Sequence, residues 1–199
     1  MKIIKNENYP SFSRQVAQCI RDGGVAAVPF DTVYGLVGNP LSDVSMEKIY
    51  KIKGRDFSKP VALVFSSLLQ LQEYIKLSPN HLRALSKAVP GRYTFILPFD
   101  IQDRLKFSDR YQQLEKIGVR IPDNAFVKNL IEDIGLPIAA TSANISGQEN
   151  CWSADEFLDQ IKNSTETPDY IIDAGQIKKL PPSEVIDISD PENPLVLRA

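Results

Sequence analysis

Apolar runs of strand length alternate along the chain with segments whose apolar residues recur at helical spacing. The most regular helical segment follows Asn124, a residue suited to cap a helix N-terminus, and it ends at Gly135, which readily closes a helix. Between them, the i, i+3, i+4 and i+7 positions are occupied by Val127, Leu130, Ile131 and Ile134. This spacing predicts an amphipathic helix.

The same alternation continues through the rest of the chain. Helices are predicted over 11–21 and 43–52, in two stretches up to Val89, and over 153–162. Strands are predicted over 25–29, 61–65 and 93–97, around 119–121, over 137–140, and in the late runs YIID, EVIDI and LVL. Because strands that alternate with helices are typical of a sheet covered by helices, the predicted fold class is α/β. We expect the segment 178–182 to form a mobile loop.

Composition limits the class of protein, its cellular location and the chemistry that the sequence allows. A chain of 199 residues, 43% hydrophobic and 24% charged, has the size of one domain with a substantial core. The formal net charge of -2 argues against a surface that binds nucleic acid throughout, although a local basic groove is compatible with it. Cys19, Cys151 and His81 are too few for a disulfide framework or a four-ligand zinc site, which disfavours metal-hydrolase and histidine-triad chemistry. No apolar run has the length of a signal peptide or a membrane span, so a cytoplasmic protein is expected.

The stretch KIKGRDFSKP, from Lys51 to Pro60, places four cations beside one carboxylate. Lys51 is explained by an ion pair with Glu47, one helical turn earlier. Lys53 lies seven residues after Met46, on the apolar stripe of the predicted helix. We therefore expect Lys53 to point inward or along the edge of a cleft.

The cations beyond the helix allow two interpretations. Gly54 ends the helix, which leaves Arg55 and Lys59 on the loop that enters the next strand. Cations at a helix C-terminus complement its dipole and are often simply solvated. Alternatively, Arg55 offers a planar fork to phosphate oxygens while the lysines act as point charges, so that three cations converge on an anion. The local sequence leaves both open.

Two further segments carry polar groups away from the ends of predicted strands. TSANISG, from Thr141 to Gly147, follows the small-residue strand PIAA, so its hydroxyl, amide and N–H groups would emerge where ligands bind in open α/β sheets. PFDTVYGLVGNP, over 29–40, combines a hydroxyl, a phenol and glycines after a buried strand. Both segments also fit ordinary turns, because Ser, Asn and Asp side chains bond their own backbone, and Tyr34 fits a core position.

Five motifs occur in one order along the chain: DTVYGL, KGR with its following KP, PG-x-x-T at 90–94, VRIP at 119–122, and TSANISG. Together they resemble the threonylcarbamoyl-AMP synthase family, the YrdC-like proteins. The resemblance implies one catalytic domain over 1–199, with a twisted, open mixed sheet and flanking helices around a deep positively charged cavity. Since the chain ends just after LVLR, we expect the additional domain of longer relatives to be absent.

The resemblance also implies an activity. Such enzymes are nucleotidyltransferases that make threonylcarbamoyl-AMP and pyrophosphate from L-threonine, bicarbonate and ATP. Partner proteins then transfer the threonylcarbamoyl group to the adenosine next to the anticodon of certain tRNAs. ATP is then a substrate, and Mg²⁺ is expected to be bound through its triphosphate without protein ligands. We expect tRNA to be contacted weakly or only through the transfer proteins, and no membrane to be involved.

Residue roles follow from the resemblance position by position. The implied catalytic residues are Lys53, Arg55, Ser142 and Asn144. The implied ATP-binding residues are Lys53, Arg55, Lys59, Asn144 and Arg198. The implied threonine-binding residues are Thr32, Arg120, Ser142 and Ser183. Attack of a carboxylate on a triphosphate brings like charges together, so the chemistry needs groups that position the reactants and neutralise phosphoryl oxygens.

Two residues depart from the family pattern. Phe30 stands where the family often has threonine, and it either reshapes the threonine pocket or packs against the sheet. Glu184 stands in PPSEV in place of a threonine, which brings a carboxylate near an anion site unless its side chain points to the other face of its strand. YTFIL after PG is shared with a less understood branch of the superfamily, but KGR and TSANISG together favour the synthase branch.

Two other functions remain open at this level. One is a noncatalytic RNA-binding module of the same superfamily, although the chain lacks a basic excess and the aromatic strand motif of RNA readers. The other is activation of carbamoyl phosphate, as in the similar domain of hydrogenase-maturation carbamoyltransferases. Those proteins carry zinc-binding cysteine pairs, which this sequence lacks.

Overall fold

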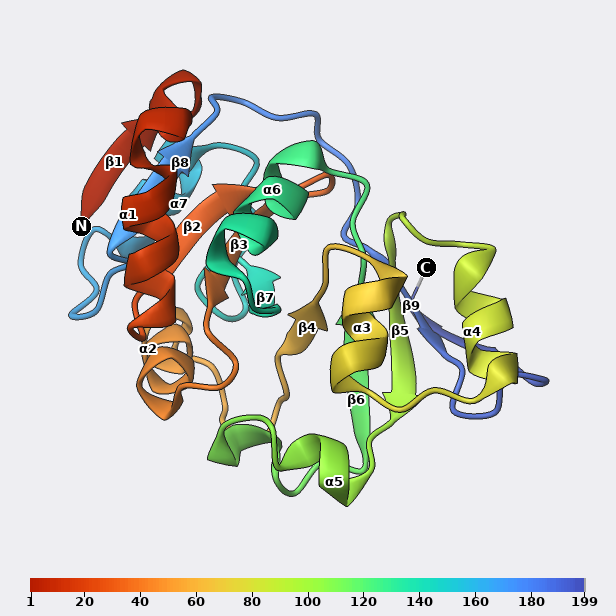
Figure 1. The fold of residues 1–199 in the computed structure, drawn as a ribbon. Coiled ribbons are helices and arrows are strands. Elements are labelled where there is room, and N and C mark those ends of the chain that lie inside the picture. Colours follow the sequence, from red (N-terminus) through yellow and green to blue (C-terminus); the bar gives the residue numbers. More distant parts are fainter. Residues whose placement is uncertain (199) are drawn as a thin grey trace.

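A mixed β-sheet runs through the molecule from edge to edge (Figure 1). The computed structural model describes residues 1–198 and, within them, ten strands in the order β1-β8-β2-β3-β7-β4-β6-β5-β9-β10. In chain order they are β1 Lys2–Lys5, β2 Val25–Pro29, β3 Tyr34–Gly38, β4 Ala62–Val64, β5 Tyr93–Pro98, β6 Lys116–Arg120, β7 Ile138–Ser142, β8 Tyr170–Asp173, β9 Glu184–Asp187 and β10 Leu195–Arg198. Parallel and antiparallel pairs are both present, and β1 and β10 form the two edges. The predicted α/β fold class with an open mixed sheet is confirmed.

Helices cover the two faces of this sheet unequally. They are η1 Asn6–Asn8, α1 Tyr9–Arg21, α2 Asp43–Lys53, α3 Leu68–Tyr74, α4 Pro79–Ser86, α5 Ile101–Arg104, η2 Asp109–Tyr111, α6 Ala125–Ile134 and α7 Ala154–Ile161. Buried residues of α2, α3, α4 and α7 join a large core cluster that extends along one face from β2 to β5. Buried residues of α1 and α6 join a second, smaller cluster over the other face, near β2, β3 and β8. The remainder of that second face is therefore available for a cavity.

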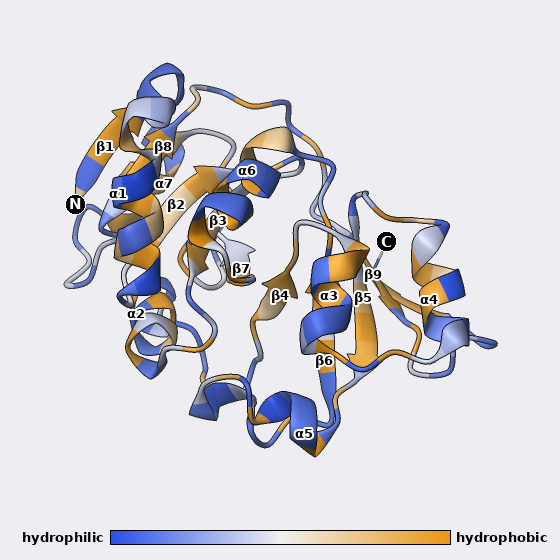
Figure 2. Ribbon diagram, in the orientation of Figure 1, coloured by the Kyte–Doolittle hydropathy of each residue, from blue (hydrophilic) through white to orange (hydrophobic). Residues whose placement is uncertain are grey.

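Strand β2 shows how the sequence builds this double-sided core. Its five residues are all buried. Val25 and Ala27 belong to the larger cluster, whereas Ala26 and Val28 belong to the smaller one. Successive strand residues point to opposite faces, so a continuous apolar run such as VAAVP fits a strand that is covered on both sides. In Figure 2, β2 is accordingly mostly hydrophobic, while α1 combines hydrophobic and hydrophilic residues.

The predicted helix ends are confirmed by cap geometry. The backbone N–H of Val127 donates to Asn124 Oδ1 over 3.0 Å at the start of α6, and Gly135 ends that helix with φ of 74°. Gly54 ends α2 with φ of 55°. Both glycines lie in the left-handed region, where residues with a Cβ are strained. None of the helices within residues 1–198 has the length and apolar character needed to cross a bilayer.

The structure differs from the sequence-based prediction at β1, β3 and β6. Residues 29–40, for which no strand was predicted beyond Pro29, contain the central strand β3. Two of its five residues are glycines, which weaken a strand signal, and both are needed for close packing. A Cβ at Gly38 would lie 2.3 Å from Ser45 Oγ. Strand β1 is a short edge strand flanked by lysines, and the apolar pattern of the sequence did not predict it. Strand β6 ends at Arg120, one residue before Ile121, which the prediction had included.

Candidate functional site

A cavity of about 380 Å³ opens on the face of the sheet that α1 and α6 leave uncovered. This volume is within the range of about 300–1,000 Å³ that is typical of small-molecule sites. Its lining residues are Phe30, Thr32, Val33, Gly35, Arg55, Pro60, Val61, Ala62, Val64, Thr94, Ile96, Gly118, Arg120, Ala140, Thr141, Ser142, Asn150, Pro182, Ser183, Val185 and Arg198. Arg55, from the loop after α2, and Ser142, at the end of β7, thus share one cavity.

Small residues on neighbouring strands leave the space for this cavity. Gly35 of β3 pairs with Ser142 of β7, and Ala62 of β4 pairs with Ala140 of β7. Gly118 of β6 also lines the cavity. Residues directly opposite each other on paired strands share a face, so these positions form a floor with little side-chain volume. Figure 2 shows the short β7 in pale colours, consistent with its Ala-Ala-Thr-Ser end.

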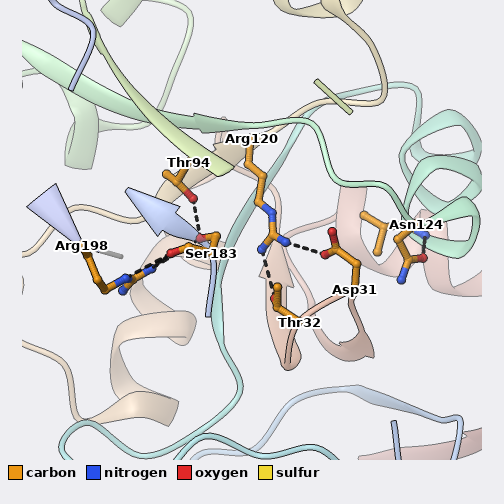
Figure 3. Close-up of polar contacts among 8 residues, drawn as sticks. Asp31, Thr32, Thr94, Arg120, Asn124, Ser183 and Arg198 are labelled. Carbon is orange, nitrogen blue, oxygen red and sulfur yellow. Dashed lines mark hydrogen bonds and ion pairs between the residues drawn. The ribbon is translucent and has the colours of Figure 1, made fainter. Parts of the chain in front are cut away.

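Arg120 is placed in the cavity by the end of β6 and by a buried carboxylate behind it (Figure 3). Its Nη2 donates to Asp31 Oδ1 over 2.5 Å, and its Nη1 donates to Thr32 Oγ1 over 3.3 Å. Arg120 Nε and Asp31 Oδ2 are buried and have no partner among the described residues. Desolvation lowers the pKa of Arg120, and the Asp31 carboxylate opposes that shift. The guanidinium is therefore held in one orientation with hydrogen-bonding capacity left over.

A second polar group joins β5, β9 and β10 on another side of the cavity (Figure 3). Thr94 Oγ1 and Ser183 Oγ are 2.7 Å apart, and Arg198 Nη2 donates to the Ser183 carbonyl oxygen over 2.6 Å. The register of β10 shifts between Val196 and Arg198, so that Arg198 lies opposite Val185, a cavity residue. Without the register shift, Leu197 would lie opposite Val185. The irregularity therefore places the guanidinium on the cavity face, as β-bulges commonly do for functional side chains.

Arg55 lies on a loop that is held by its own contacts. Its Nε donates to the carbonyl of Lys59 over 3.1 Å and its Nη2 donates to the carbonyl of Pro60 over 3.1 Å. Tyr50 Oη donates to the same Lys59 carbonyl over 2.8 Å. Arg55 Nη1 has no hydrogen-bond partner among the described residues, and the side chain lines the cavity. One edge of the fork therefore fixes the loop, while the remaining nitrogen is free for a ligand.

Lys53 points inward, as its position on the apolar stripe predicts, but it does not line the cavity. Its Nζ donates to the carbonyls of Ser142 and Asn144 over 2.5 and 2.8 Å, and to Asn144 Oδ1 over 2.8 Å. These three bonds use every proton of the ammonium. Desolvation, with a contribution from nearby Arg55, lowers the pKa of Lys53 to about 7. Lys53 is thus a buried cation that supports the Ser142–Asn144 turn from behind.

The sequence allows two interpretations of these three cations, and the structure gives each side chain a different position. Of the three, only Arg55 lines the cavity. Lys53 is buried behind it, and Lys59 is exposed outside its lining. The pattern placed Lys53 on the inward stripe of the helix and the other two cations on the loop, but the carbonyl groups that bind Lys53 lie 89 and 91 residues later in the chain. Only the tertiary structure brings them together.

Asn144 supports the turn and is likewise absent from the cavity lining. Ser142 Oγ donates to Asn144 Oδ1 over 2.6 Å, and Asn144 Nδ2 donates to the carbonyl of Gln148 over 2.7 Å. The backbone N–H of Ser146 donates to the Lys53 carbonyl over 2.8 Å. This network fixes Ser142 at the cavity wall through Lys53 and Asn144.

The two departures from the family pattern have different outcomes. Ser183 and Val185 line the cavity, whereas Glu184, between them, does not. Successive side chains of a strand point to opposite faces, so the Glu184 carboxylate lies on the face away from the cavity. Phe30 does line the cavity. Sequence reasoning did not assign roles to Thr94, Thr141 or Asn150, although Thr94 and Thr141 belong to the motifs PG-x-x-T and TSANISG.

The cavity lining is cationic. It contains Arg55, Arg120 and Arg198, and none of its residues within 1–198 is an aspartate or glutamate. Among residues 1–198, Arg120 alone of the three is in an ion pair with a carboxylate, that of Asp31. No group of three or more His, Cys, Asp or Glu side chains suited to a metal ion occurs in the described part of the chain. The described lining therefore offers an anion guanidinium and hydroxyl donors.

Comparison with known proteins agrees with this architecture. The family model Sua5_yciO_yrdC, described as "Telomere recombination", matches residues 18–199. Threonylcarbamoyl-AMP synthase from Vibrio vulnificus is 31% identical over 178 residues, which cover 87% of this chain and 92% of that protein. The crystal structure of Pyrococcus abyssi Sua5 complexed with L-threonine matches 99% of this chain with a TM-score of 0.85 and 31% identity. The crystal structure of Escherichia coli YciO also matches 99% of this chain, with a TM-score of 0.80 and 28% identity.

The lengths of these two neighbours differ. The match covers 93% of the YciO chain but only 56% of the Sua5 chain, so this chain spans about half the length of the archaeal protein. The family model nevertheless matches almost the whole sequence, including all the motif segments and every arginine of the cavity. The chain belongs to the Sua5/YciO/YrdC family.

Proposed function

We propose that the protein is an L-threonylcarbamoyladenylate synthase, which forms threonylcarbamoyl-AMP and pyrophosphate from L-threonine, bicarbonate and ATP. The observation that carries the proposal is a cavity in which Arg55, Arg120 and Arg198 surround hydroxyl groups without a lining carboxylate. A reaction between two anions requires such a lining, because preorganised cations and donors stabilise the charge that builds up in the transition state.

The proposed reaction has two steps. The neutral amine of threonine attacks the carbon of bicarbonate, a C–O bond breaks and water leaves, to give an N-carboxylated threonine whose carboxylate carries the negative charge. An oxygen of the new carboxylate then attacks the α-phosphorus of ATP, and the bond from that phosphorus to the bridging oxygen breaks as pyrophosphate leaves. Neither step requires an oxidant or a reductant, so positioning and electrostatic stabilisation are the main tasks of the protein.

The nucleotide end of the cavity is assigned to Arg55 and Arg198. Arg55 has a free Nη1, and both guanidinium groups can bind phosphoryl oxygens through several donors. Lys53 and Asn144 act indirectly in this proposal, because their donors and acceptors already hold the turn that carries Ser142. Lys59, which is exposed, adds only long-range attraction for the nucleotide.

The amino-acid end is assigned to Arg120 and Thr32. Arg120 lines the cavity, and its guanidinium is already oriented by Asp31. A carboxylate at this position would gain a charge-assisted hydrogen bond. Ser142 and Ser183 supply hydroxyl groups on neighbouring walls. In this proposal the threonine amine lies between the two ends, where the carboxylated product would meet the α-phosphate.

Magnesium enters the proposal only with the nucleotide. The lining residues within 1–198 offer hydroxyl, amide and guanidinium groups but no carboxylate, so they do not fit a protein-bound Mg²⁺. The ion would be held by the triphosphate oxygens, and no step is assigned to a protein ligand. We further propose that residues 1–199 act as one catalytic domain in the cytoplasm, and that other proteins transfer the product to the adenosine next to the tRNA anticodon.

An omission assay tests the proposed function. Pyrophosphate release is measured with the complete mixture and with threonine, bicarbonate or ATP left out in turn, and we expect release only when all three are present. Arg55→Ala should abolish release while circular dichroism and the melting temperature remain close to those of the wild type. Release that does not depend on threonine would contradict the proposal. Tight, salt-sensitive tRNA binding without any release would instead favour the RNA-binding module.

A further inference from the structure

Phe30 lies at the boundary between the core and the cavity. Its side chain is 6% exposed and belongs to the smaller core cluster, yet it also lines the cavity. Phe30 follows β2 directly, in the turn that leads to β3, and its ring folds back over Gly35. A Cβ at Gly35 would lie 2.5 Å from Phe30 Cε2 and 2.6 Å from Cδ2. The ring therefore occupies the space that any other residue at position 35 would need.

The same ring is a neighbour of the proposed carboxylate site. The Arg120 guanidinium carbon is 5.7 Å from the centroid of the Phe30 ring. An amino acid bound to Arg120 through its carboxylate has its Cβ only two bonds from that carboxylate carbon. Its side chain therefore comes within van der Waals reach of the ring, which lines the cavity beside Thr32.

Core packing alone does not account for this arrangement. An aromatic residue that served only the core would have no need to lie against a glycine within the cavity wall. Two features, a bulky ring and the absence of a side chain beneath it, together determine how far the wall extends into the cavity. The ring and the glycine can be substituted separately. A smaller residue at position 30 moves the wall away from the cavity, whereas a side chain at position 35 moves the ring into it.

We propose that Phe30, seated on Gly35, is a specificity-determining residue that limits the size of the amino-acid side chain the cavity accepts. The inference rests on the proposed function, because it assumes that the amino-acid carboxylate binds Arg120. With the ring against Gly35, the remaining space admits the branched, small side chain of threonine. A smaller residue at position 30 opens the wall to longer side chains, and a Cβ at position 35 pushes the ring outward and favours side chains smaller than threonine.

The test compares amino acids rather than total activity. Pyrophosphate release with bicarbonate and ATP is measured as kcat/KM for glycine, serine, threonine, valine and leucine in the wild type, Phe30→Leu, Phe30→Ala and Gly35→Ala. One methylene in a pocket changes selectivity by roughly 10–200-fold. We therefore expect Phe30→Ala to raise the leucine-to-threonine ratio by about tenfold or more, with a smaller rise for Phe30→Leu. Gly35→Ala should raise the serine-to-threonine ratio by a similar factor.

Matched controls separate specificity from stability. Phe126 packs on the same core cluster as Phe30 but does not line the cavity, so Phe126→Ala should lower stability without changing either ratio. Gly38 lies on the same strand as Gly35, and a Cβ there would meet Ser45 Oγ, which is also outside the cavity lining. Gly38→Ala should therefore disturb packing and leave selectivity unchanged. Phe30→Leu keeps much of the apolar volume and provides a folded variant if Phe30→Ala is too unstable.

The outcomes distinguish failure of this inference from failure of the proposed function. If the wild type releases pyrophosphate with threonine but all variants keep its ratios among the five amino acids, Phe30 is only a core residue and the inference is wrong. If the wild type shows no amino-acid-dependent release, the proposed function itself is wrong. In that case, the same five amino acids are compared by calorimetry, and equal affinities in wild type and variants would overturn the steric role as well.

Discussion

At the scale of single residues, Lys53 is the most unusual group in the site. The residue is 2% exposed, and its ammonium donates to three oxygen atoms, none of which belongs to a carboxylate. A buried cation without a counter-ion is costly, and the lowering of its pKa from 10.5 to about 7 expresses that cost. A polyanion bound in the adjacent cavity would favour the charged form and raise the pKa again.

Lys53 therefore predicts a pH dependence of nucleotide binding. Above pH 7 the free protein loses the Lys53 proton, and binding of ATP must take it up, so the affinity for ATP should fall as the pH rises from about 7 to 9. Calorimetry in two buffers with different ionisation enthalpies measures this uptake. In Lys53→Met the uptake should vanish, and in Lys53→Arg, whose charge persists in this range, the affinity should stay flat. Equal proton uptake in wild type and Lys53→Met would contradict the assignment.

Arg120 predicts a separate effect on threonine. Arg120→Lys keeps the positive charge but loses the planar fork that now contacts both Asp31 and Thr32. Loss of one charge-assisted hydrogen bond costs about 1.5–3 kcal/mol, so the KM for threonine should rise roughly 10–150-fold while the KM for ATP changes little. Arg104→Lys is the control, because the Arg104 guanidinium is likewise held by a hydrogen bond, to the Gln112 carbonyl, but does not line the cavity. An unchanged threonine KM in Arg120→Lys would exclude the proposed carboxylate contact.

At the scale of elements, the register shift in β10 decides where the last cavity arginine points. Because Arg198 lies opposite Val185, its guanidinium reaches the Ser183 carbonyl and the cavity, whereas Leu197 is exposed and outside the lining. Exchanging the two residues, Leu197→Arg with Arg198→Leu, preserves composition and net charge. We expect the exchange to weaken ATP binding as much as Arg198→Ala does, as measured by calorimetry. Wild-type affinity in the exchanged protein would show that only the charge of β10 matters.

Elements with local signals could be predicted from the sequence, and those that depend on distant partners could not. Helix α6 was predictable because its cap, its apolar stripe and its terminal glycine are all within one segment. Strand β3 was not, because the two glycines that weaken its pattern are required by Phe30 and Ser45, residues outside the strand. The inward direction of Lys53 followed from helical spacing, but its partners did not, since they lie on the turn after β7.

At the scale of the whole molecule, the site is the part of one sheet face that helices leave open. Helices α1 and α6 cover this face near β2 and β3, and Phe30 marks the limit of that cover. Beyond it, small residues on β3, β4, β6 and β7 form the floor, and arginines from three separate segments form the walls. The formal net charge of -2 is thus compatible with an anion site, because three arginines gather in a cavity whose described lining contains no carboxylate, whatever the charge of the remaining surface.

This concentration predicts how ATP should stabilise the protein. A ligand present at 100 times its Kd stabilises the native state by about 2.7 kcal/mol, which for a domain of this size corresponds to a rise in Tm of roughly 5–10 °C. Differential scanning fluorimetry with increasing MgATP measures the shift. We expect Arg55→Ala and Arg198→Ala to abolish it, because both guanidinium groups line the cavity. Lys59→Ala removes a cation from the same loop but from outside the lining, so the shift should persist. If the three variants lost the shift equally, attraction by surface charge rather than a shaped cavity would explain binding.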